Sequence, residues 1–123
     1  MAARLTELVI DANDPDALAT FWTSVLGWEV ASTDDEGVVI ADPSGRLPTL
    51  MFARVPEAKA GKNRLHLDLY SDDQHAEVER LLALGATRHP RVPEPDDDFV
   101  LLQDPEGNVF CVVDTTYVAT PPG

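Results

Sequence analysis

The chain is poor in cysteine and in cationic residues. Its single cysteine, Cys111, excludes an internal disulfide and suits a reducing compartment. Lysine and arginine together number 9, against 22 aspartates and glutamates, so the formal net charge is −13. Because such a surface repels phosphate groups, neither nucleic acid nor an anionic membrane is an expected partner.

Long apolar runs are missing as well. No segment approaches the roughly 20 apolar residues that a membrane-spanning helix needs. The first residues also lack the charged-then-apolar pattern of a signal peptide. We therefore expect a cytoplasmic protein. An apolar fraction of 44% over 123 residues is sufficient for the core of one ordinary domain.

What the chain does contain is an internal repeat of about half its length. Helix-ending and turn motifs recur in the same order, each beside a similar run of apolar residues. The corresponding pairs are Leu26-Gly27 with Leu84-Gly85, Asp42-Pro-Ser-Gly45 with Asp104-Pro-Glu-Gly107, Glu7 with His66, and Asp14 with Asp73. Several matches in one register indicate two copies of a single structural module.

The predicted elements give both copies the order βαβββ. In the first copy we predict strands at 5–12, 28–32, 38–41 and 49–55, with a helix from Pro15 to the residue before Gly27. In the second we predict strands at 65–70, 86–89, 99–102 and 109–114. Its helix would begin at Ser71-Asp-Asp-Gln74, which has the form of a capping box. Module one thus covers about 4–55, a linker 56–64, module two 65–114 and a tail 115–123.

Two βαβββ modules predict an α+β fold. One such module covers a single face of its sheet with its helix and leaves the other face open. We expect the modules to pair in a pseudo-twofold arrangement as one domain over residues 1–123. The open faces would then curve into an open, partly closed barrel, with the helices outside.

The open faces carry the candidate ligand pocket. Side chains alternate along a strand, so residues two apart share a face. The residues that this alternation places on the open faces are Glu7, Asp11, Met51, Ala53, His66, Asp68, Tyr70, Val109 and Cys111. Polar groups on an inward face predict a ligand site rather than a dry core.

Four segments together resemble the vicinal oxygen chelate superfamily, which includes glyoxalase I, bleomycin-resistance proteins and extradiol dioxygenases. The segments are Asp14-Pro-Asp-Ala-Leu-Ala-Thr-Phe-Trp22, Phe52-Ala-Arg-Val-Pro-Glu57, Asn63-Arg-Leu-His-Leu-Asp-Leu69 and Asp104-Pro-Glu-Gly-Asn108. The segment that begins at Asn63 opens the second module. The segment that begins at Phe52 is typical of the small glyoxalase-like domains. The resemblance covers residues 5–114 and implies the two-module fold.

The resemblance also implies where a metal would bind. Metal-using members place ligands on the first and last strands of each module, which makes Glu7 and His66 the candidate ligands here. Cys111 stands where a glutamate is expected on the last strand, and the stretch 49–53 has neither carboxylate nor imidazole. With two credible ligands we expect no cofactor, or at most a weakly bound divalent metal. A hydrogen-bonded Glu7–His66 pair would then form a polar floor for the pocket.

Two functions therefore remain open. The first is a protein that binds a small organic molecule without a complete metal site. The second is a metal-dependent lyase, isomerase or dioxygenase that uses Glu7 and His66, with Asp11 or Asp68 as a possible general base. Cys111 is either a small apolar residue or a thiolate ligand for zinc. We also predict a homodimer, because a partial barrel leaves sheet edges uncovered.

Two charged stretches are interpreted as solvent-exposed connections. The basic residues Lys59, Lys62 and Arg64 lie in the predicted linker, where they could attract a carboxylate or be simply solvated. The acidic run Glu94-Pro-Asp-Asp-Asp98 follows the proline-rich loop of the second module. We expect this run to be a solvated loop.

Overall fold

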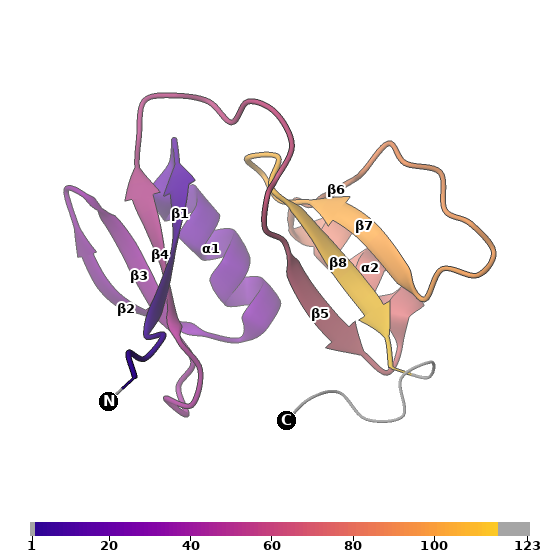
Figure 1. Ribbon diagram of the computed structural model, residues 1–123, viewed down its shortest axis with the longest axis horizontal. Helices are drawn as coiled ribbons and strands as arrows, with labels where there is room; N and C mark the ends of the chain where they lie inside the picture. Colours follow the sequence, from indigo (N-terminus) through magenta and orange to yellow (C-terminus); the bar gives the residue numbers. More distant parts are fainter. Residues whose placement is uncertain (1, 116–123) are drawn as a thin grey trace. The chain divides into compact units, whose positions relative to one another are not determined.

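The computed structural model describes residues 2–115. The chain divides into two compact units, Met1–Ala58 and Lys59–Gly123. Each unit has the element order βαβββ, which confirms the expected α+β class built of two modules (Figure 1). That the two units act as one domain stays a prediction.

The first unit contains a mixed sheet of four strands and one helix. Its elements are β1 (Glu7–Ala12), α1 (Pro15–Leu26), β2 (Glu29–Asp34), β3 (Gly37–Ala41) and β4 (Thr49–Arg54). The strand order is β1-β4-β3-β2, with β1 parallel to β4 and the remaining pairs antiparallel. The predicted helix is confirmed at both ends: Asp14 accepts a hydrogen bond from the Ala17 amide, and Gly27 closes the helix with φ of 69°.

The second unit repeats this topology. Its elements are β5 (Leu67–Ser71), α2 (Gln74–Leu84), β6 (Thr87–Arg88), β7 (Phe99–Gln103) and β8 (Val109–Asp114). The strand order is β5-β8-β7-β6, with β5 parallel to β8. The helices α1 and α2 have 12 and 11 residues, and among the described residues no helix is long and apolar enough to cross a membrane.

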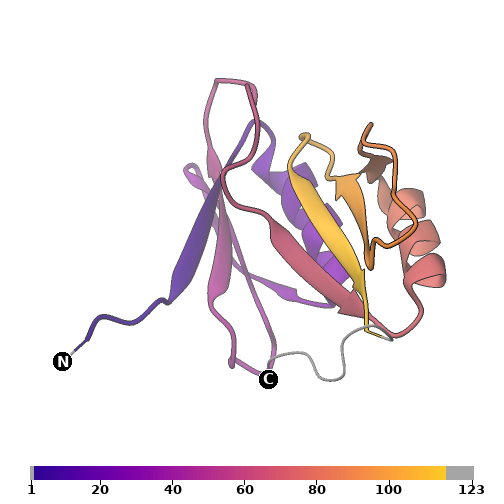
Figure 2. The same cartoon turned by 45° about the vertical axis from the view of Figure 1, so that its right-hand side comes forward.

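In each unit the helix covers one face of the sheet (Figures 1 and 2). The core of the first unit includes Leu18, Trp22, Ile40, Leu50 and Phe52, and that of the second includes Val78, Leu81, Leu102, Phe110 and Val112. Burial of each such side chain contributes roughly 1.5–3 kcal/mol. The opposite face of each sheet is free of its own helix, and the predicted ligand residues of the strands lie there.

The predicted capping box at the start of α2 is wrong. Asp73, not Ser71, is the N-cap, and its side chain accepts a hydrogen bond from the Ala76 amide at 3.2 Å. The Ser71 hydroxyl accepts from the Asp73 amide at 3.1 Å instead. Gln74 does not turn back to the cap, because its side-chain amide donates to the carbonyl of Val112 at 2.9 Å and to a second carbonyl in the loop before β7. Tertiary carbonyls thus compete successfully for this amide.

The fifth strand begins later than predicted, at Leu67 rather than at residue 65. The Asn63 side chain donates to the carbonyls of Leu65 and Val109, at 3.0 and 3.2 Å. These bonds tie the entering chain to β8, and Leu65 is left 82% exposed. His66 therefore immediately precedes β5.

Candidate functional site

The second unit has a pocket on the face of its sheet that α2 does not cover. Its volume is about 380 Å³, within the range of roughly 300–1,000 Å³ that is usual for small-molecule sites. The lining residues are His66, Asp68, Tyr70, Asp98, Phe99, Leu101, Cys111 and Val113. Apolar and aromatic walls therefore surround a small polar floor.

Strand register explains why these residues meet. In the parallel pair, Asp68 of β5 lies opposite Cys111 of β8. In the antiparallel pair, Leu101 of β7 lies opposite Cys111, and Phe99 lies opposite Val113. Because residues directly opposite each other share a sheet face, rows of side chains from three strands line one side of the sheet.

His66, Asp68 and Cys111 form the polar floor of the pocket. His66 Nε2 lies 3.2 Å from Asp68 Oδ1, and both side chains are about half exposed. Cys111 is buried. Burial, the negative charge of Asp68 and the hydrogen bond that the thiol donates to this carboxylate together raise the pKa of Cys111 to about 11. The thiol therefore keeps its proton at neutral pH.

These three residues also form a possible divalent-metal site. One ligand atom from each lies within 4.8 Å of the others. Imidazole, carboxylate and thiolate suit a borderline-soft ion such as zinc, but a thiol must lose its proton in order to bind it. The raised pKa of Cys111 opposes this loss. The positions of the three donor atoms therefore suit a metal ion, but the protonated thiol opposes tight binding at neutral pH.

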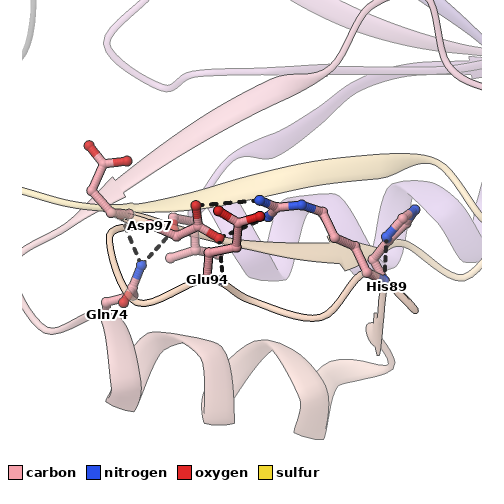
Figure 3. Close-up of polar contacts among 7 residues, drawn as sticks. Gln74, His89, Glu94 and Asp97 are labelled. Atoms are coloured by element: carbon pink, nitrogen blue, oxygen red, sulfur yellow. Dashed lines mark hydrogen bonds and ion pairs between the residues drawn. The ribbon is translucent and has the colours of Figure 1, made fainter.

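The loop between β6 and β7 contributes Asp98 to the pocket lining and is held by its own polar contacts (Figure 3). Arg91 Nη1 lies 3.0 Å from Asp97 Oδ2, and the Arg91 guanidinium lies 5.1 Å from the centre of the Phe99 ring. The Glu94 amide donates to Asp97 at 2.9 Å. This amide and the Arg91 guanidinium hold the pKa of Asp97 below its usual value. Hydrogen bonds and an ion pair within the loop thus close it, and its Arg91 contacts Phe99 of the pocket lining.

This loop was interpreted from sequence as a solvated acidic run, and that interpretation is incomplete. The side chain of Asp97 is only 14% exposed, because it accepts hydrogen bonds from within the loop. The carbonyl of Asp98 accepts from the Gln74 side chain and from the Asp114 amide. The loop is therefore attached to α2 and β8 at its end.

The structure brings four of the predicted pocket residues together: His66, Asp68, Tyr70 and Cys111. Val109 of β8 lies opposite Gln103 of β7, two residues before Cys111, and is not part of the pocket lining. Sequence reasoning did not assign Asp98, Phe99 and Leu101 to the site. The alternation along 99–102 could have indicated the last two, but a face can be assigned to this strand only once its pairing with β8 is known.

The predicted residues of the first unit lie on the face of its sheet that α1 does not cover. The register pairs Glu7 with Thr49, Val9 with Met51, and Asp11 with Ala53. Glu7 accepts a hydrogen bond from the Thr49 hydroxyl at 2.9 Å. The contribution of Glu7, Asp11, Met51 and Ala53 to a ligand pocket stays a prediction, and so does the Glu7–His66 pair.

Comparison with known proteins gives one family match and many similar folds. The family model described as "Glyoxalase-like domain" matches residues 7–113. No curated protein matches the chain. A glyoxalase/bleomycin resistance protein/dioxygenase family enzyme from Burkholderia phytofirmans is 21% identical, with a TM-score of 0.72 over 91% of this chain and 98% of that one.

Two further solved structures have the same fold. A possible glyoxalase from Bacillus cereus is 19% identical, with a TM-score of 0.69 over 91% of this chain and 99% of that one. A lactoylglutathione lyase from Agrobacterium tumefaciens is 18% identical, with a TM-score of 0.64 over 98% of this chain and all of that one. At these identities the likeness shows a shared fold and says nothing of a shared reaction.

Proposed function

The chain belongs to the glyoxalase-like domain family, and from this premise we propose that it binds a small organic molecule in the pocket of its second unit. The predicted resemblance to the vicinal oxygen chelate superfamily is confirmed. The observation that carries the proposal is the pocket of about 380 Å³, with Phe99 and Leu101 as walls and His66 and Asp68 as floor. An apolar body with one or two polar groups suits such a lining.

We propose that binding here does not depend on a tightly held metal. The thiol of Cys111 is protonated at neutral pH, and the His66 imidazole already pairs with Asp68. The imidazole, the thiol and the carboxylate can still orient a ligand through hydrogen bonds. The floor therefore serves recognition, with His66 as its most exposed donor.

The experiment is a thermal-shift screen of small organic molecules against the wild type, His66→Ala and His75→Ala. His75 is an exposed histidine of α2, outside the pocket lining, so its variant is a matched control. We expect hits whose affinity falls about tenfold in His66→Ala, because one hydrogen bond to the ligand is lost, and stays unchanged in His75→Ala. Equal affinities in all three proteins would contradict the proposal.

A metal-dependent enzyme is the second candidate, and one observation favours it: the donor atoms of His66, Asp68 and Cys111 converge within 4.8 Å. Plasma mass spectrometry on dialysed protein separates the two candidates, with zinc, nickel, iron and manganese added back in turn. We expect well under one equivalent of each ion. About one equivalent that is lost in His66→Ala and kept in His75→Ala would establish the second candidate.

We further propose a cytoplasmic homodimer. The single cysteine suits a reducing compartment. Strands β2 and β6 are edge strands of their sheets, and an edge strand is commonly covered by another chain. Light scattering should give twice the mass of 13.4 kDa, and a monomer mass at micromolar concentration would contradict the dimer.

A further inference from the structure

A second, smaller cavity lies next to the pocket, at the end of the sheet where β6 is the edge strand. Its volume is about 150 Å³, and it shares Phe99 and Leu101 with the pocket. Its other lining residues are Arg88, His89, Arg91, Pro93 and Val100. Three nitrogen-bearing side chains thus converge on one small cavity in a chain whose formal net charge is −13.

Arg88 brings a cation whose ion pair is weak. Its Nη2 lies 3.7 Å from Glu79 Oε1, which is beyond hydrogen-bond distance, and both side chains are more than half exposed. Exposed pairs of this kind contribute little. The five N–H donors of the guanidinium therefore remain suited to a ligand in the cavity.

His89 brings a hydrogen-bond donor to the smaller cavity. Its Nδ1 accepts a hydrogen bond from the Arg91 amide at 3.1 Å, and this bond requires an unprotonated Nδ1. In a neutral imidazole the proton is then on Nε2, which becomes an N–H donor. The backbone of the loop therefore determines which nitrogen of His89 can donate.

Arg91 connects the two cavities. Its guanidinium lies over the Phe99 ring, which lines both of them. Its pair with Asp97 fixes its position and occupies only part of its five donors. The charge of Arg91 also acts on the thiol of Cys111 in the pocket floor, whose pKa it lowers in part. A ligand in the pocket would therefore meet this positive charge at the boundary with the smaller cavity.

We propose that the cavity lined by Arg88, His89 and Arg91 binds the anionic group of the ligand. The inference rests on the proposed function and deepens it: the ligand is an organic acid whose apolar body lies against Phe99 and Leu101. Its carboxylate, or an oxyanion of similar size, occupies the smaller cavity. Guanidinium groups recognise such oxyanions through charge-assisted hydrogen bonds.

Sequence reasoning pointed elsewhere for positive charge, to Lys59, Lys62 and Arg64 in the linker. Residues 88–91 contain two arginines and a histidine around a proline, and the sequence predicts them only as the end of a strand and the start of a loop. Their proximity to the pocket depends on the pairing of β6 with β7, where Arg88 lies opposite Leu102. That pairing sets the cationic residues at the end of the strand that carries Phe99.

The test compares matched acids and neutral amides, such as 1-naphthylacetate and 1-naphthylacetamide, together with pairs of smaller and larger bodies. Binding is followed by nitrogen-15 NMR titration at the amides of His89, Phe99, Leu101 and Cys111. The proteins are the wild type, Arg88→Gln and Arg80→Gln. Arg80 pairs with Glu77 on α2 and lines neither cavity, so its variant loses the same charge as a control.

We expect the wild type to bind the acids about tenfold more tightly than the amides, as charge-assisted bonds to a guanidinium imply. In Arg88→Gln this preference should fall to about twofold, with the amides bound as before, and in Arg80→Gln it should persist. Equal binding of acids and amides, or a preference that survives Arg88→Gln, would overturn the inference and leave the proposed function intact. If no pair shifts the pocket amides, both fail.

Discussion

The two units have the same topology but differ in the side chains on the sheet face that the helix does not cover. By register, Met51 of the first unit corresponds to Cys111 of the second, because they pair with Val39 and with Leu101 respectively. Two residues before Val39 on β3, the first unit has Gly37; the second unit has Phe99 at the equivalent place, two residues before Leu101 on β7. The aromatic wall of the pocket therefore has no side chain at the equivalent place in the first unit.

The connections before these positions differ as well. In the first unit β2 and β3 are joined by a tight turn, in which the Asp34 side chain accepts from the amides of Glu36 and Gly37 at 2.8 and 3.2 Å. In the second unit the connection is the loop 89–98, which the Arg91–Asp97 pair closes (Figure 3). The first unit thus has a glycine and a tight turn where the second unit has an aromatic residue of the pocket lining and a long connection.

We expect the largest effect from a substitution that tests whether the first unit requires glycine at position 37. A Cβ atom at Gly37 would lie 2.1 Å from the carbonyl oxygen of Phe52, so Gly37→Ala must separate paired strands. We expect a loss of about 3 kcal/mol in the free energy of unfolding, measured by urea denaturation.

The control for this prediction is Gly45→Ala. Gly45 has a positive φ of 71° but open space around its Cβ position. This variant should lose about 1 kcal/mol from backbone strain alone. Similar losses in the two variants would mean that close strand approach does not determine the glycine at the position equivalent to Phe99.

A smaller effect should separate the two Asp-Pro-x-Gly turns, which look alike in sequence. Asp104 is 2% exposed and accepts from the amides of Glu106 and Asn108 at 2.9 and 3.0 Å, and from the Asn108 side chain at 2.9 Å. Asp104→Ala would leave these partly buried donors without their acceptor and should cost about 2–3 kcal/mol in urea denaturation.

The equivalent change in the first unit is Asp42→Ala. The Asp42 carboxylate accepts from the hydroxyl and the amide of Ser44 at 2.6 and 3.0 Å, and water can replace it there because this turn is at the surface. We therefore expect a clearly smaller loss than for Asp104→Ala. A larger loss from Asp42→Ala would contradict the difference in burial between the turns.

The smallest expected effect concerns the titration of Cys111, which has no counterpart at Met51. In the folded chain the pKa of Cys111 is about 11, above its ordinary value of 9.0. A raised pKa favours the folded state below the unfolded pKa, and this contribution is lost as the pH rises from about 9 to about 11. The free energy of unfolding should therefore fall more steeply over this range in the wild type than in Cys111→Ala.

Asp68→Asn tests the cause of this pKa. It removes the negative charge that disfavours the thiolate, so the pKa of Cys111 should fall toward its ordinary value. The rate of alkylation by iodoacetamide at pH 8.5 should then rise about fivefold, since the thiolate is the reacting species. An unchanged rate, with folding intact by circular dichroism, would mean that burial alone sets the pKa.

Much of the fold could be predicted from sequence because it follows from local patterns. The repeat, the helix that starts at Pro15 and the stops at Gly27 and Gly85 depend on residues within a few positions of one another. Strand alternation assigned His66, Asp68 and Cys111 to one face, and all three residues line the pocket. Propensity, capping and side-chain period act over short distances, so one sequence is sufficient to infer them.

The tertiary structure alone decided which of these residues meet. His66 pairs with Asp68, Gln74 bonds to β8 instead of its own cap, and the pocket-lining Phe99 lies under the Arg91 guanidinium. Each of these contacts depends on strand register or on the path of a loop, which has no period in the sequence. The sequence by itself determined two βαβββ modules with polar open faces, whereas the pairing of strands and the closing of one long loop turned one of those faces into a pocket.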